Sequence, residues 1–247
     1  MIGILIDALI VGVIVMFVLK NRKTTQLRCM IETLSYVVSM VFALPLGIKV
    51  ANMAYTYFFR TAVANKIADT VAQSIVVETQ LSGFQRVLNQ MPSMIKNSVE
   101  SYGVNSSENI NAVEKILNSG RSTSALEITD IIARPVMEGV FRGVFVLIFF
   151  VGILFIVKAI GAMAENLLYT QDRATINTSL AGVFGAFKAI CVLTFAIAII
   201  ELVLPAFPQI PFFTAEQFNM SFIFKLFYHN NVIMLFLGEG IYPTLVS

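Results

Sequence analysis

The sequence predicts an all-α, polytopic membrane protein with about four transmembrane helices and additional amphipathic interfacial helices. Hydrophobic residues make up 57% of the chain and charged residues 13%, whereas about a quarter of the residues in an ordinary soluble domain are charged. The mean hydropathy is +0.81. With so few charges, lipid has to replace water over much of the surface. The formal net charge of +2 is too small to indicate a nucleic-acid partner.

The apolar segment 180–204 is the most distinct of the predicted spans. At about 1.5 Å per residue it reaches roughly 37 Å, which exceeds a hydrocarbon core of about 30 Å. Ala181 with Gly185, and Gly182 with Ala186, form two overlapping pairs of small residues four positions apart. Such pairs form a smooth strip that another helix can approach closely, so this face is predicted to contact protein.

The N-terminal region, residues 1–59, is predicted to hold two transmembrane helices joined by a basic cytoplasmic turn. Residues 2–19 are apolar except for Asp7, and four basic residues follow up to Arg28. The positive-inside rule places this turn in the cytoplasm and the N-terminus on the extracytoplasmic side. In the second span, the Pro45-Leu46-Gly47 sequence predicts a kink or a break. Glu32 and Tyr36 are expected to share one helix face because they are four residues apart.

Residues 60–138 are predicted to form an extracytoplasmic insertion of amphipathic helices. A last helix in this region is expected to begin at Ser124, which starts a capping-box pattern, and to stop before Pro135. The helices are expected to lie on the bilayer or to pack on one another, and a ligand-binding domain is the alternative. Apolar residues repeat at helical spacing at Val63, Ile67, Val71 and Ile75, at Phe84, Leu88, Met91 and Ile95, and at Ile110, Val113 and Leu117.

Residues 139–204 are predicted to hold the two C-terminal transmembrane helices. Gly139 and Gly143 form a small-residue pair at the outer end of the first, where another helix could pack. Two basic residues, Arg142 and Lys158, lie within the same apolar stretch. Their long side chains can reach the lipid headgroups, or they can line a polar path between helices.

The C-terminal region, residues 205–247, is predicted to form an interfacial or re-entrant segment. Three prolines up to position 211 disfavour a continuing helix, and polar residues interrupt the apolar stretch 218–237, which makes a full span unfavourable. His229 has no ligand partner at useful spacing, so a surface or capping role is favoured over metal binding. Cys29 and Cys191 are expected to be reduced packing residues, and no cofactor or metal is predicted.

Two separated parts of the chain resemble the colicin V production protein family. The first combines Ile6-Asp7 within an apolar helix, a basic turn, and a second helix that starts Arg28-Cys29-Met30-Ile31-Glu32; the second is the pattern Asn177-x-x-x-x-Gly182-x-x-Gly185-x-x-Lys188. The likeness covers residues 2–60 and 139–204. It implies a multi-pass protein of a bacterial inner or plasma membrane, linked to toxin production or export and to envelope homeostasis, without an established catalytic activity. The positions on the family pattern are Asp7, Glu32, Asn177, Gly182, Gly185 and Lys188.

These patterns leave three functions to compare. The first is a non-enzymatic membrane protein that acts through helix packing and envelope partners. The second is a homo-oligomeric pore or transporter for ions or small solutes, because a charge at the bilayer centre costs roughly 2.5 to 3.5 kcal/mol on insertion scales and needs an explanation. The third, an intramembrane enzyme, is disfavoured because neither a His-Glu-x-x-His nor a Gly-x-Ser-x-Gly motif occurs. We therefore expect that the chain is not an enzyme.

Overall fold

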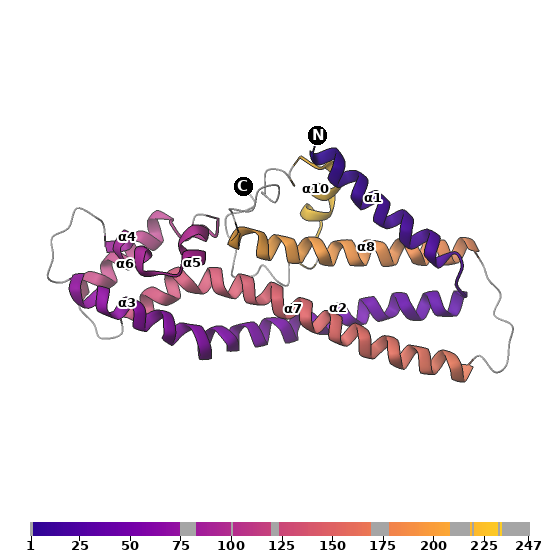
Figure 1. The fold of residues 1–247 in the computed structure, drawn as a ribbon, viewed down its shortest axis with the longest axis horizontal. Helices are drawn as coiled ribbons and strands as arrows, with labels where there is room; N and C mark the ends of the chain where they lie inside the picture. The colour runs from indigo at the N-terminus through magenta and orange to yellow at the C-terminus, as the bar shows by residue number, and fades with distance from the viewer. Residues whose placement is uncertain are drawn as a thin grey trace. The chain divides into compact units, whose positions relative to one another are not determined.

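The protein is built from helices, four of which are long and apolar enough to cross a membrane (Figure 1). The computed structural model describes residues 2–74, 83–99, 101–119, 124–168, 178–207, 218, 220–231 and 233. Every regular element within those residues is helical, so the all-α prediction is confirmed. The four long apolar helices are Ile2–Asn21, Leu27–Ala68, Ala125–Glu165 and Ser179–Ala206.

The chain divides into two compact units, each drawn from several parts of the sequence. Unit 1 comprises Met1–Gly47, Val144–Glu201 and Phe212–Leu237. Unit 2 comprises Ile48–Gly143, Leu202–Pro211 and Gly238–Ser247. Residues far apart in the sequence therefore become neighbours within each unit.

Unit 1 is held together by close helix contacts. Its described helices are α1 (Ile2–Asn21), the first part of α2 (Gln26–Ala54), the last part of α7 (Ser124–Leu168), α8 (Thr178–Val203) and α10 (Phe222–His229). A Cβ atom at Gly185 on α8 would lie 2.8 Å from the carbonyl oxygen of Phe17 and 2.9 Å from the Cα of Val18. Both atoms belong to the backbone of α1, so only glycine permits α1 and α8 to approach this closely.

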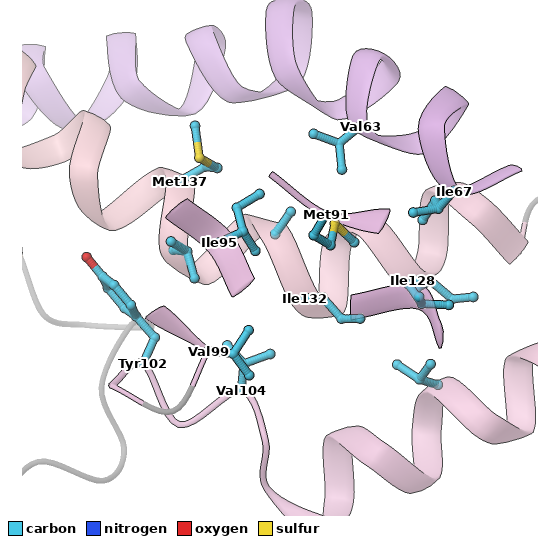
Figure 2. Packing of buried hydrophobic residues seen from close by; sticks show 14 of the residues in the cluster. Val63, Ile67, Met91, Ile95, Val99, Tyr102, Val104, Ile128, Ile132 and Met137 are labelled. Carbon is cyan, nitrogen blue, oxygen red and sulfur yellow. The ribbon is translucent and has the colours of Figure 1, made fainter. Parts of the chain in front are cut away.

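Unit 2 has a hydrophobic core of its own. It contains the π-helix η1 (Tyr55–Phe59), α3 (Arg60–Ser74), α4 (Gly83–Gln90), α5 (Ser93–Ser98), α6 (Ser107–Ser119) and the 3₁₀ turn η2 (Leu204–Ala206), with the adjoining parts of α2 and α7. Val63, Ile67, Met91 and Ile95 all belong to this core, and Figure 2 shows Met91 between Ile95 and Ile67. The described residues of the apolar stripes in the 60–138 region thus pack on one another, which was one of the two arrangements expected. Ile75 and the side chain of Val71 lie outside the described residues.

The end predicted for one helix is wrong. We expected the helix that begins at Ser124 to stop before Pro135, but α7 continues through Pro135 to Leu168. Of the kink or break predicted at Pro45, the break is absent, because Pro45 lies inside α2. A proline within a helix removes one backbone hydrogen bond. In α7 the flanking side chains of Ile132 and Val136 are fully buried in the unit 2 core, and this packing offsets the loss.

The transition from α2 to α3 is likewise continuous. The second apolar helix runs from Leu27 to Ala68 and passes through the π-helix Tyr55–Phe59, so the boundary set at residues 59 and 60 falls within it. The boundary at residues 138 and 139 falls within α7.

Most of the region 205–247 lies outside the described residues. Its described helix, α10, has eight residues, which is about 12 Å and too short to cross a bilayer.

Candidate functional site

The strongest candidate site is an ion pair that joins α2 and α8 inside unit 1. The Lys188 ammonium donates a hydrogen bond to Glu32 Oε2, and the Lys188 side chain is only 4% exposed. The second carboxylate oxygen, Oε1, accepts from Arg28 Nε at 3.3 Å, one helical turn earlier on α2. Both oxygens of Glu32 therefore have cationic partners. Two positions of the family pattern, 156 residues apart, meet in this pair.

A tyrosine and a second lysine extend the site. Lys158 Nζ on α7 donates to the Tyr36 hydroxyl at 3.2 Å and lies 4.6 Å from the centre of the Tyr36 ring. Lys188 Nζ lies 5.2 Å from the same ring centre and 5.6 Å from the ring of Phe17 on α1. Cations are attracted to the faces of aromatic rings, and more strongly where water is excluded.

We call Arg28, Glu32, Tyr36, Lys158 and Lys188 the unit 1 cluster. Positions 28, 32 and 36 follow one another at intervals of four residues, so α2 presents them on one face. Three of the five side chains are cations and one is a carboxylate. In apolar surroundings such a cluster fixes helices relative to one another, and its excess positive charge can attract an anion.

Asp7 lies elsewhere in unit 1, where it caps α10. Its Oδ1 accepts from the Ser221 hydroxyl at 2.5 Å and from the Ile223 amide at 2.9 Å, and its Oδ2 accepts from the Phe222 amide at 3.3 Å. Ser221 Oγ in turn accepts from the Phe224 amide at 3.0 Å. A carboxylate at a helix N-terminus satisfies free amides and the helix dipole, so Asp7 fastens α10 to α1.

Two further contacts hold the α10 segment against α8. Asn231 Nδ2 donates to the carbonyl oxygen of Thr194 at 3.0 Å. The Tyr228 hydroxyl hydrogen-bonds with the Glu201 carboxylate, and burial together with this negative neighbour raises the pKa of Tyr228 to about 12. The phenol therefore keeps its proton at neutral pH and stays a donor.

The small residues predicted to allow helix packing lie mainly on buried faces. Ala181, Gly182 and Gly185 are buried, and Ala186 is half-buried. In unit 2, a Cβ at Gly139 would lie 2.8 Å from the Tyr102 ring, whose hydroxyl donates to the carbonyl oxygen of Leu202 at 2.8 Å. Gly143 is also buried. The last position of the family pattern, Asn177, lies outside the described residues.

Arg142 and Lys158, the two residues predicted to line a polar path, belong to different units. Each has partners within its own unit: Arg142 Nη2 donates to Glu138 Oε2 at 3.3 Å, and Lys158 donates to Tyr36.

Unit 2 contains a charged arrangement that the sequence reasoning missed. Asp130, Arg134, Glu138 and Arg142 alternate in sign at four-residue spacing on α7, and we call them the α7 charge row. Arg134 Nε donates to Glu138 Oε1 at 2.7 Å. Arg60 holds Asp130 through a bidentate contact, with Nη2 at 2.6 Å from Oδ2. The spacing is visible in the sequence and could have revealed the row.

Among the described residues, no group of three His, Cys, Asp or Glu side chains is placed to hold a metal ion. Comparison of the chain with protein-family models, with curated proteins and with solved structures gave no match.

Proposed function

We propose that the chain is a non-enzymatic, multi-pass protein of a bacterial inner or plasma membrane that acts through helix packing and protein partners in the envelope. A link to toxin production or export and to envelope homeostasis follows from the resemblance to the colicin V production family. The observation that carries the proposal is that acidic and basic side chains bind other parts of the same protein. Glu32 and Lys188 form an ion pair, and Asp7 accepts hydrogen bonds from groups at the N-terminus of α10.

Paired charges of this kind favour a structural role. A carboxylate whose two oxygens accept hydrogen bonds from two cations, as in Glu32, is held in one position by those contacts. Removing one member of a buried pair is strongly destabilising, which ties these residues to the helix arrangement. The exposed surface of the long helices is apolar and suits contact with lipid or with another membrane protein.

Photo-crosslinking in membranes tests the proposal. A photoreactive residue would replace Phe58 of unit 2 or Phe155 of unit 1, which are 74% and 76% exposed, with Ile4 at 75% as a third position. We expect crosslinks to defined proteins, or to a second copy of the chain, from some positions and not from others. A strictly monomeric protein that crosslinks only to lipid from all three positions would contradict the proposal.

A homo-oligomeric pore or transporter is the second candidate. It is favoured by the presence of two lysines and one carboxylate from three helices at one place within the apolar unit 1. Ion and small-solute flux into liposomes would be measured for the parent, for Lys158→Gln and for Gly182→Leu with Gly185→Leu as a packing control. Flux that requires Lys158 would support the pore. Absence of flux from correctly inserted protein would leave the non-enzymatic partner-binding role.

A further inference from the structure

Lys158 differs from the other cations of the unit 1 cluster because no carboxylate among the described residues forms an ion pair with it. Among the described residues no carboxylate oxygen lies within 4.0 Å of its ammonium, whose hydrogen bond goes to the neutral Tyr36 hydroxyl. Glu32 is already engaged by Arg28 and Lys188. The cluster therefore has more positive charge than its single carboxylate can balance.

The position of Lys158 along α7 places this excess charge within reach of the lipid headgroups. The next charged residue on α7 is Glu165, seven residues further along, which corresponds to about 10 Å along the helix axis and indicates where the apolar stretch ends. A lysine side chain can extend over several ångströms while its ammonium stays in polar surroundings. A phosphate at the headgroup level can therefore meet the ammonium without entering the centre of the bilayer.

The surroundings of Lys158 suit a lipid better than a soluble anion. Phe155 and Val151 lie three and seven residues before Lys158 on α7, close to its face of the helix, and are 76% and 58% exposed, so acyl chains can lie against the surface beside the lysine. Tyr36 adds a polar group, because its hydroxyl accepts from Lys158 and keeps its own proton for donation to an anion. Basic pockets between transmembrane helices bind anionic headgroups in this way.

We propose that Lys158 and Tyr36 bind the phosphate group of an anionic phospholipid, with Lys188 adding positive charge from α8. The ammonium of Lys158 supplies a charge-assisted hydrogen bond and the Tyr36 hydroxyl supplies a neutral one. This site goes beyond the proposed function, because a partner-binding protein and a pore could each contain it.

Lipid titration with native mass spectrometry tests the site. The purified full chain in detergent would be titrated with phosphatidylglycerol or phosphatidylcholine, for the parent, Lys158→Gln, Lys158→Arg and the control Lys225→Gln, whose lysine is exposed on α10. We expect the parent to prefer phosphatidylglycerol. Lys158→Gln should bind it roughly fivefold more weakly, whereas Lys158→Arg and Lys225→Gln should bind it as the parent does.

The outcomes separate the possible anions. Equal binding of phosphatidylglycerol by the parent and Lys158→Gln, or no preference over phosphatidylcholine in the parent, would overturn the proposal. Inorganic phosphate would be added as a competitor. Displacement of the lipid by millimolar phosphate in the parent would overturn the lipid as the natural ligand and assign the site to soluble phosphate. Retained binding by Lys158→Arg shows that a loss in Lys158→Gln comes from the missing charge and not from misfolding.

Discussion

Replacing Lys188 by methionine should destabilise unit 1 more than replacing Lys188 and Glu32 together. Lys188 is almost completely buried and its ammonium contacts the Glu32 carboxylate. In Lys188→Met the carboxylate keeps its charge but loses its buried partner. In the double variant Lys188→Met, Glu32→Gln no charge remains to be compensated, and methionine fills most of the volume of the lysine stem.

The magnitude follows from the exposure of the two side chains. Removing one member of a buried pair costs about 3 to 5 kcal/mol. Glu32 is 25% exposed and retains its contact with Arg28, so part of its charge stays compensated. We therefore expect Lys188→Met to lower the free energy of unfolding by about 2 to 3 kcal/mol. The double variant should have a free energy of unfolding within about 1 kcal/mol of that of the parent.

Cys29 provides the assay. Its thiol is fully buried near the pair on α2, and a Cys191→Ser background makes it the only cysteine of the chain. The rate of reaction with a thiol-specific dye, followed across an SDS titration, reports the free energy of unfolding. Lys225→Met on α10 serves as the control, because Lys225 is exposed.

Two results would refute the reasoning. Unfolding of Lys188→Met at the same SDS fraction as the parent would mean that the ion pair does not stabilise the folded protein. The second such result is that the changes in unfolding free energy of Lys188→Met and Glu32→Gln add in the double variant. Additivity would mean that the two residues act independently of each other.

Three further predictions concern other contacts. Asp7→Ala should speed hydrogen exchange at the amides of Phe222 and Ile223 on α10 by about 5- to 150-fold, because loss of their acceptor costs about 1 to 3 kcal/mol. Unchanged exchange would argue against capping. Gly185→Leu should lower the midpoint of thermal unfolding in detergent, because a side chain there meets the backbone of α1. Gly12→Leu should leave the midpoint unchanged, because no atom lies within 4 Å of a Cβ at that position. Equal effects of the two variants would contradict the close approach of α1 and α8. Asp130→Asn should weaken the bidentate Arg60 contact by about 1 to 2 kcal/mol, measured by SDS unfolding, and a neutral result would remove this pair from the stabilising contacts.

The four long helices could be predicted because hydropathy and length act locally. A segment such as 180–204 is apolar over more than the thickness of a bilayer core, and no distant residue is needed to recognise it. The small residues around Gly185 also predicted a close helix contact, and there the backbone of α1 meets α8. The identity of the partner helix could not be predicted, because small-residue spacing describes one surface only.

The unit 1 cluster was only partly visible in the sequence. The four-residue spacing of Glu32 and Tyr36 predicted that they share a face of α2, and both meet lysines from other helices. The partners Lys158 and Lys188 lie 122 and 156 residues further along the chain. Such pairs depend on how helices pack, which periodicity does not report. Asp7 could not be assigned for the same reason, since the amides that it caps lie more than 200 residues away.

The α7 charge row shows how one wrong helix end conceals a site. An end before Pro135 places Arg134 in one helix and Glu138 in another segment, so their spacing has no meaning. In a continuous helix they are neighbours, and Arg134 Nε donates to Glu138 Oε1 at 2.7 Å. Pro135 has no amide hydrogen to offer the carbonyl of Ile131, one turn earlier. The ion pair between Arg134 and Glu138 spans this weakened turn, and the buried side chains of Ile132 and Val136 pack beside it. These contacts form only when the helix continues through Pro135, and together they outweigh the local cost of the proline.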